Sequence, residues 1–133
     1  MSSGDMVFNK MKERHHARQE QSLQIATLEV ARERGLKDVI LNPDAKVEDK
    51  LIALRDIHDR WFVRDRVKWD EEQAVRLAAI DMIGDYSYNP QRSDVSYLRE
   101  VSGSHADYKT RKAAASQASR IKYMLDVEDE SRH

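Results

Sequence analysis

The side chains best suited to binding a metal lie near the N-terminus, where His15 and His16 stand between Glu13 and Glu20. The i,i+3 spacing of Glu13 and His16 would place a carboxylate and an imidazole on one face of a helix. A di-iron helical bundle requires that unit twice, together with two further carboxylates. The sequence holds no second unit, so we predict solvated histidines and no metal or other cofactor.

Residue types of a hydrolytic triad occur at Ser104, His105 and Asp107. Side chains this close in sequence diverge around a helix start and do not make triad geometry. Ser104 and Asp107 instead fit a capping box in which Asp takes the role of Glu. The chain has only 4 scattered glycines, and no glycine-rich phosphate loop. We therefore predict a protein that is not an enzyme and has no small-molecule substrate.

The composition indicates a small core with a charged surface. Of the 133 residues, 40% are hydrophobic and 35% are charged, against roughly 25% charged in an average protein. A monomer of this size buries only about two-thirds of the surface that its unfolded chain exposes. We therefore expect additional burial against a protein partner or another copy of the chain, giving a homo-oligomer.

The sequence also limits the compartment and the surroundings. It contains no cysteine, which excludes disulfides and cysteine-ligated zinc. No apolar run approaches the ~20 residues of a membrane span, and residues 1–16 lack the apolar stretch of a secretory signal. We expect no membrane contact and a cytoplasmic location, or a place in a particle assembled inside the cell.

The fold class that we predict is all-α, because good helix formers dominate and strand-like alternation is absent. Gly35 is placed where a glycine would end the first helix, and Gly103 where a short helix would break. The prediction is three main helices at about 5–34, 45–83 and 104–126, and one short helix at about 94–101. We divide the chain into an N-terminal, partly solvated helix at 1–37, a helical core domain at 38–126 and a disordered acidic tail at 127–133.

The strongest helical signal lies in the middle of the chain, since residues 47–83 contain neither glycine nor proline. A continuous helix of that length would extend roughly 55 Å and could be coiled-coil-like. Its first half carries one apolar stripe at steps of three and four, formed by Val47, Leu51, Leu54, Ile57 and Trp61. The charged stretch at 64–72 leaves open whether this helix is continuous or kinked.

The large aromatic side chains of this segment are candidates for either core or interface. Trp61 falls on the apolar stripe and is predicted to be core, whereas Phe62 lies one step off it and is predicted to be exposed. Exposed aromatic side chains beside arginine are typical interface anchors. The residues that we predict as a protein interface are Leu51, Leu54, Trp61, Phe62, Val67 and Trp69.

A second candidate surface is basic. Residues 86–125 carry seven basic and three acidic side chains, and residues 126–133 carry one basic and four acidic. Basic side chains interleaved with tyrosines can follow a phosphate backbone and stack on bases, but the same side chains also suit a solvated outer face. The residues that we predict for nucleic-acid contact are Arg92, Arg99, Lys109, Arg111, Lys112, Arg120 and Lys122.

Residues 43–79 resemble a helical segment of the phage ERF-type single-strand annealing proteins. The likeness lies in VEDKLIALRDIHDRW followed by a charged helix, and it covers little more than a quarter of the chain. That family implies homologous DNA annealing by oligomeric rings. The β-rich remainder expected of the family has no counterpart in this sequence. The resemblance favours a phage or bacterial accessory protein.

The sequence thus leads to two functional hypotheses. The first is a non-enzymatic helical interaction or assembly protein that oligomerises or docks on a larger complex. The alternative is a nucleic-acid-binding accessory protein, of the phage or bacterial DNA recombination or packaging type, that uses the basic last helix. The sequence does not identify the partner or the stoichiometry.

Overall fold

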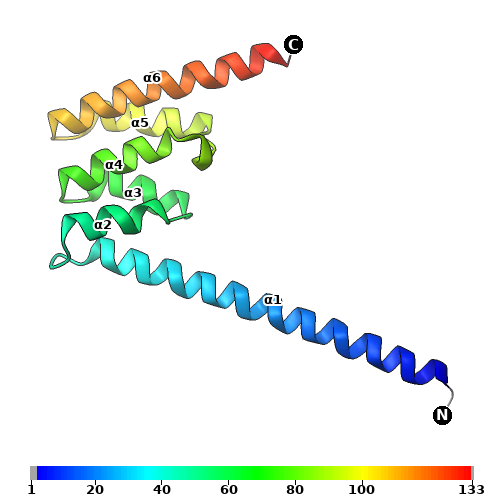
Figure 1. The fold of residues 1–133 in the computed structure, drawn as a ribbon. Coiled ribbons are helices and arrows are strands. Elements are labelled where there is room, and N and C mark those ends of the chain that lie inside the picture. The colour runs from blue at the N-terminus through cyan, green and yellow to red at the C-terminus, as the bar shows by residue number, and fades with distance from the viewer. Residues whose placement is uncertain (1–2, 133) are drawn as a thin grey trace. The chain divides into compact units, whose positions relative to one another are not determined.

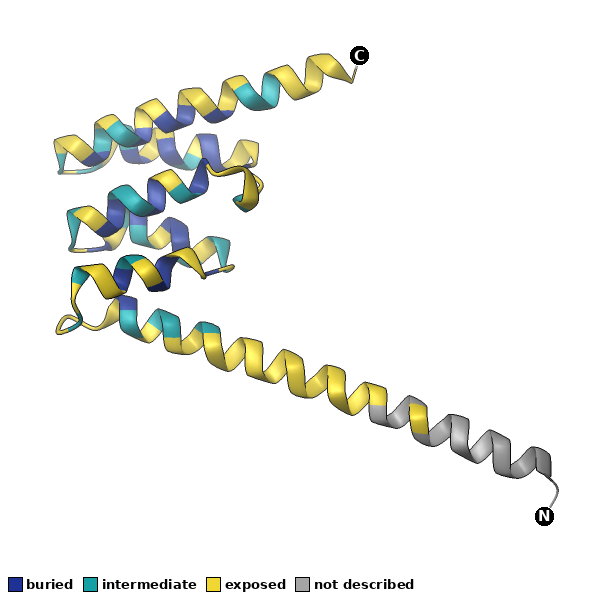
Figure 2. Cartoon of the chain, viewed as in Figure 1, coloured by how far each residue is buried: buried dark blue, intermediate teal, exposed yellow. Residues whose placement is uncertain are grey.

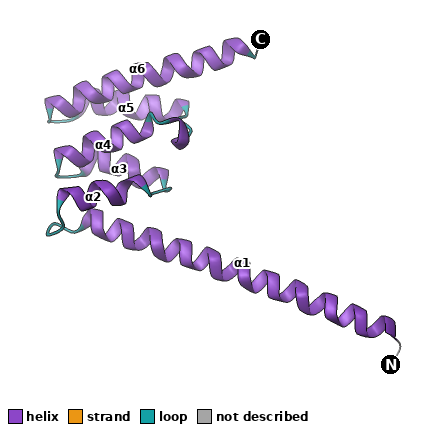
Figure 3. Cartoon of the chain, viewed as in Figure 1, coloured by secondary structure: helices purple, strands orange, loops and turns teal. Residues whose placement is uncertain are grey.

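A computed structural model of the protein describes the backbone of residues 3–132 and the side chains of residues 14 and 18–132. These described residues form six α-helices, one short 3-10 helix and no strand (Figures 1 and 3). The elements are α1 (Ser3–Leu41), α2 (Val47–Arg55), α3 (Arg60–Trp69), α4 (Gln73–Ile83), η1 (Tyr86–Tyr88), α5 (Arg92–Ser104) and α6 (Tyr108–Ser131). The all-α prediction is confirmed, but the predicted number of helices is wrong.

The chain divides into two compact units, residues 1–35 and residues 36–133. The first unit is one helix, the greater part of α1. Because a lone helix has no second element to pack against, its apolar side chains stay exposed. These side chains are Leu23, Ile25, Leu28 and Val30. Gly35 does not end the helix as predicted, because α1 continues to Leu41 and its last turns supply the core residue Ile40 to the second unit.

The second unit is a two-layer stack of antiparallel helices. α3 pairs with α4 and α5 pairs with α6, each pair forming a hairpin. α2, α4 and α6 follow one another in one layer, and α3 contacts α5 in the other (Figure 1). Buried residues gather where these layers meet (Figure 2). The core includes Leu54, Val63, Val67, Val75, Ala79, Ile80, Ile83, Leu98, Val101, Ala114 and Ile121.

The predicted central helix at 45–83 is wrong, because the segment forms α2, α3 and α4. Asp59 caps α3 by accepting hydrogen bonds from the backbone N–H groups of Trp61, at 3.1 Å, and Phe62, at 3.3 Å. After α3, the Asp70 carboxylate accepts from the Glu72 N–H at 2.9 Å and shapes the turn into α4. Both breaks thus fall at aspartates whose side chains replace helical hydrogen bonds.

The two C-terminal helices are longer than predicted. α5 begins at Arg92, where the Asp94 carboxylate accepts from the Gln91 N–H at 2.8 Å, and it continues through Gly103 to Ser104. Asp107 caps α6 by accepting from the Thr110 N–H at 3.2 Å. α6 then extends to Ser131, so residues 127–131 are helical where the sequence predicted a disordered tail.

Candidate interaction surface

A stripe of exposed side chains follows the outer side of α3. The start set by Asp59 turns Val63 and Val67 into the core and leaves Trp61, Asp65 and Trp69, at i, i+4 and i+8, facing solvent. Trp61 is 71% exposed and Trp69 is 67% exposed. We call these three residues the tryptophan stripe. Its length is about 12 Å at 1.5 Å per residue.

Cations lie beside both indole rings of the tryptophan stripe. The guanidinium carbon of Arg64 lies 5.1 Å from the ring centroid of Trp61, and Lys68 Nζ lies 5.2 Å from that of Trp69. Such contacts add modest attraction at exposed sites. They favour particular ring positions without covering the rings, which leaves most of each indole available to another molecule.

The two cations beside the stripe each pair with a carboxylate, Arg64 with Asp94 and Lys68 with Glu100. Lys68 Nζ pairs with Glu100 at 3.0 Å, whereas Asp65 has no ion pair among the described residues. The Tyr97 hydroxyl between α3 and α5 donates to the Arg64 carbonyl at 2.5 Å. Burial raises the pKa of Tyr97 to about 12, with the negative charges of Asp65 and Glu100 adding to the effect.

A buried ion pair holds α3 against α5. Arg64 donates to Asp94 Oδ1 from two nitrogens, at 2.6 and 2.9 Å, and Arg60 donates to Asp94 Oδ2 at 3.0 Å. The Asp94 side chain is fully buried. Sequence reasoning missed this cluster, because position 94 entered that reasoning only as the start of the predicted short helix. An aspartate whose two oxygens receive arginine from another helix is recognisable only in three dimensions.

A second charged cluster connects α4 to the start of α6. Arg76 donates to the Thr110 hydroxyl at 3.0 Å, to Asp107 Oδ2 at 3.1 Å and to the Asp70 carbonyl at 2.7 Å. The pKa of Asp107 is held well below its usual value, first by the hydrogen bond from Thr110 and then by the one from Gln73. This cluster positions the basic helix α6 on the stack.

The structure reverses several predictions about the interface residues. Trp61, predicted to be core, is exposed, and Phe62, predicted to be exposed, is half-buried against the core. Leu54 and Val67 are fully buried, so they cannot contact a partner in this fold. The physical reason is the break at Asp59, which changes the helical phase and moves the apolar stripe to a different set of positions.

Leu51, the remaining predicted anchor, lines a cleft of about 580 Å³ between α2, α4 and η1. Ala78 and Met82 add apolar surface, and Asp81 and Asp85 add carboxylates. Three basic side chains, those of Arg55, His58 and Arg60, complete the polar lining. With charges of both signs in an open cleft, the arrangement selects neither an anion nor a cation.

Only part of the predicted nucleic-acid surface is available. Arg92 pairs with Asp126 and Asp129, and Lys122 pairs with Asp126 at 2.7 Å. Arg111 donates to the His105 carbonyl at 2.8 Å and so caps the end of α5. The predicted residues that are exposed and make no such bond are Arg99 on α5 and Lys109, Lys112 and Arg120 on α6.

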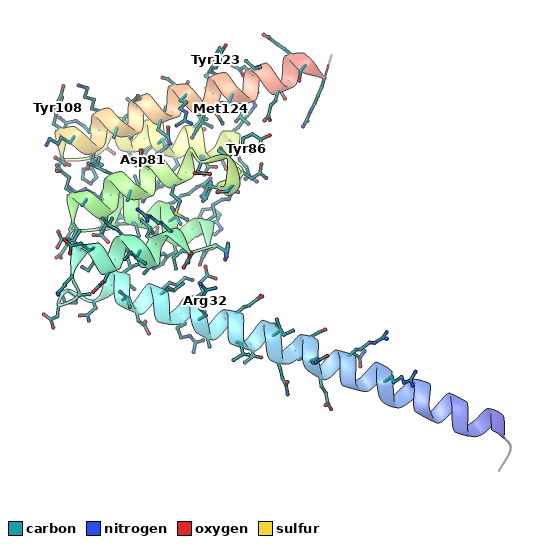
Figure 4. The ribbon with its side chains drawn as sticks, in the orientation of Figure 1. Arg32, Asp81, Tyr86, Tyr108, Tyr123 and Met124 are labelled. Carbon is teal, nitrogen blue, oxygen red and sulfur yellow. The ribbon has the colours of Figure 1, made fainter. Side chains whose placement is uncertain are left out.

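The outer face of α6 combines these cations with small and aromatic side chains. Residues 108–125 contain five basic and no acidic side chains. Lys112, Ser116 and Arg120 are exposed along one line of the helix. Tyr108 begins the helix and Tyr123 lies in its second half, and both are exposed (Figure 4). We call Lys112, Ser116 and Arg120 the basic stripe.

The residues with triad letters do not form a triad. The Ser104 hydroxyl donates to the Glu100 carbonyl at 2.7 Å, and His105 Nδ1 accepts from the Asp107 backbone N–H at 3.0 Å. These bonds end α5 and begin α6. No group of three metal-ligating side chains occurs among the described residues, and the side chains of His15 and His16 lie outside them.

Comparisons with known proteins place the chain in no family. No family model matches it, and the comparisons with curated proteins and with solved structures found no match. The resemblance of residues 43–79 to the annealing proteins therefore gains no support from these comparisons. Across the described residues, no helix has the length and apolar character that crossing a membrane requires.

Proposed function

We propose that the protein is a non-enzymatic helical interaction protein that docks on a larger assembly or on further copies of itself through the tryptophan stripe. The observation that carries this proposal is the exposure of Trp61 and Trp69 along one line of α3. Tryptophan is enriched at the centres of protein interfaces, where truncating one such side chain commonly costs about 2 kcal/mol or more.

The rigidity of α3 supports the proposal. The Asp59 cap fixes its first turn, and the buried pair of Arg64 and Asp94 fixes its position against α5. A surface held in its binding conformation loses little conformational entropy when a partner arrives. The two indoles are therefore presented on a preorganised support rather than on a loop.

The first unit offers a second apolar surface. Leu23 and Leu28 are each 69% exposed on α1, and the neighbouring Ile25 and Val30 are also exposed. Packing against a further helix would remove this apolar area from water, at about 25 cal/mol per Å². A protein that assembles through both units would account for the additional burial that its composition leads us to expect.

Capture experiments with the full chain test the proposal. Proteins retained from the native source by the wild type should be lost, by roughly thirtyfold in affinity, with the double variant W61A/W69A. Tyr86→Ala removes an exposed aromatic side chain from η1 and should retain them. The proposal is wrong if two results are found together: W61A/W69A captures the same proteins with the affinity of the wild type, and it also binds further copies of the chain with that affinity.

The alternative function, nucleic-acid binding, is favoured by residues 108–125 of α6, which carry no acidic side chain and expose Tyr108 and Tyr123. Binding to a single-stranded oligonucleotide should then weaken steeply with salt, because phosphate contacts release counterions. The variant K109Q/K112Q should reduce binding, whereas Arg92→Gln should not, since Arg92 is neutralised by Asp126 and Asp129. Absence of binding at low salt would eliminate this alternative.

A further inference from the structure

We propose that the tryptophan stripe of one copy docks on the basic stripe of a second copy, so that the protein assembles head to tail. This inference rests on the proposed function and names the partner: a further copy of this chain. Both stripes lie in the second unit, on different helices of different layers. One molecule can therefore present both at once.

The two stripes match in spacing. Trp61 and Trp69 are eight residues apart on α3, and Lys112 and Arg120 are eight residues apart on α6. Each pair therefore extends about 12 Å along its helix. When the two helices lie side by side, both cations can reach an indole face, as cation–π contacts require. Asp65 and Ser116, each four residues after the first member of its pair, then oppose one another.

The two stripes also match in charge. Asp65, which lies between the two tryptophans, is an exposed carboxylate without an ion pair among the described residues, whereas Glu100 is already paired with Lys68. Lys112 is exposed on a helix that carries no acidic side chain over residues 108–125. Contact of the Asp65 carboxylate with the cations of the basic stripe favours association and selects this pairing over contacts between two basic stripes.

The shapes fit for a simple reason. The outer face of α6 between Lys112 and Arg120 is formed by Ala115, Ser116 and Ser119, which are all small and exposed. Two large indoles need such a low surface in order to approach a helix closely. A tryptophan buries about 150–250 Å², so two of them give an interface at the small, transient end of the range. We expect self-association that is weak and sensitive to salt.

The symmetry of the contact determines what it builds. Because a stripe on α3 meets a different stripe on α6, the interface is heterologous and each added copy leaves one of each stripe free. Copies therefore add to form an open chain or a closed ring. A twofold dimer, in which the same surface meets itself, is not the expected product.

Sedimentation velocity on the full chain tests this arrangement. The wild type should sediment faster with rising concentration at low salt, and salt should reverse the effect. Two variants should each remain a 15.5 kDa monomer. They are W61A/W69A, which removes the indoles of the tryptophan stripe, and K112E/R120E, which reverses the charge of the basic stripe. The control R18E/R34E makes the same change in net charge on α1 and should still assemble. Thermal unfolding verifies that the variants, altered only at exposed positions, remain folded.

Mixing the two defective variants gives the decisive measurement. Each retains one intact stripe, so an equimolar mixture should form a 1:1 heterodimer that grows no further. A wild type that stays monomeric at about 1 mM, or a mixture that stays monomeric, overturns the inference. Self-assembly of W61A/W69A and of K112E/R120E, each measured by itself, also overturns the inference, because association then uses another surface. Trp-dependent capture of a foreign protein without self-association would overturn it while leaving the proposed function intact.

Discussion

Residues 3–41 and residues 47–83 are both rich in helix formers, yet they fold in opposite ways. The first segment contains Gly35 and is one helix of 39 residues. The second contains neither glycine nor proline and is broken into α2, α3 and α4. The comparison teaches that helix breakers are neither sufficient nor necessary to end a helix in this protein.

The difference arises from what surrounds each segment. Through residue 34, α1 has no tertiary contact within its own unit, so local propensity alone decides, and a single glycine costs only about 1 kcal/mol. Residues 47–83 must bring Leu54, Val67 and Ile80 into one core. Folding the chain back buries these side chains, and the caps at Asp59 and Asp70 replace the helical hydrogen bonds lost at each turn.

The largest effect that we predict is that of Asp94→Ala, which leaves Arg64 buried and unpaired. Breaking one side of a buried ion pair costs about 3–5 kcal/mol, so the urea midpoint of the second unit should fall sharply. Hydrogen exchange should accelerate in α3 and α5 but remain unchanged at residues 18–34. Glu100→Gln, at the exposed pair with Lys68, is the control and should cost under about 1 kcal/mol. Equal losses of stability in the two variants would contradict the conclusion that the buried pair of Arg64 and Asp94 stabilises the fold more than the exposed pair does.

Asp59→Ala, at the turn between α2 and α3, should lower the stability by less than Asp94→Ala does. Removing a helix cap costs about 0.5–2 kcal/mol, measured as the free energy of unfolding. Asp59→Asn retains the acceptor for Trp61 and Phe62 but loses the charge that pairs with Lys37 at 2.8 Å, so its loss should be intermediate. An unchanged stability in both variants would show that core packing alone sets this break.

The pH dependence of the Asp59→Asn effect follows from the same contacts. The hydrogen bond from Lys37 is the main cause that holds the pKa of Asp59 below its usual 3.8. The charged form is therefore the stabilising one, present above that value and lost as acid protonates the folded carboxyl. The difference between wild type and Asp59→Asn should accordingly shrink as the pH falls below about 4.

The smallest effects on stability are those of replacing two glycines by alanine, and we expect them to have opposite signs. Nothing lies within 4 Å of a Cβ added at Gly103, in the last turn of α5, so Gly103→Ala should stabilise by up to about 1 kcal/mol. A Cβ at Gly84 would meet Gln117 Nε2 at 1.7 Å and displace an amide that donates to the Ile80 carbonyl at 2.9 Å. Gly84→Ala should therefore destabilise by about 1 kcal/mol. Thermal unfolding measures both, and the same sign at both positions would contradict this assignment.

Sequence reasoning located features that depend on neighbouring residues. The helical class follows from local patterns that the structure confirms. The predicted capping box is wrong in its register, because Ser104 is the last residue of α5 and Asp107 itself is the N-cap of α6. The exposure of Trp61 and Trp69 could not be predicted in the same way. Their orientation depends on where α3 begins, and one shift of the helix start turns a core position into a surface position.

By itself, the sequence determined that the chain is helical and has a basic stretch followed by acidic residues, because propensity and charge are properties of each residue. Only the tertiary structure decided where the central segment turns, which tryptophans face solvent and which arginines are neutralised. Those outcomes depend on groups far apart along the chain, such as Arg64 and Asp94 or Arg92 and Asp126. Arg64 and Asp94 interact strongly because packing removes water around them, whereas Arg92 and Asp126 stay exposed and meet because α5 lies beside α6.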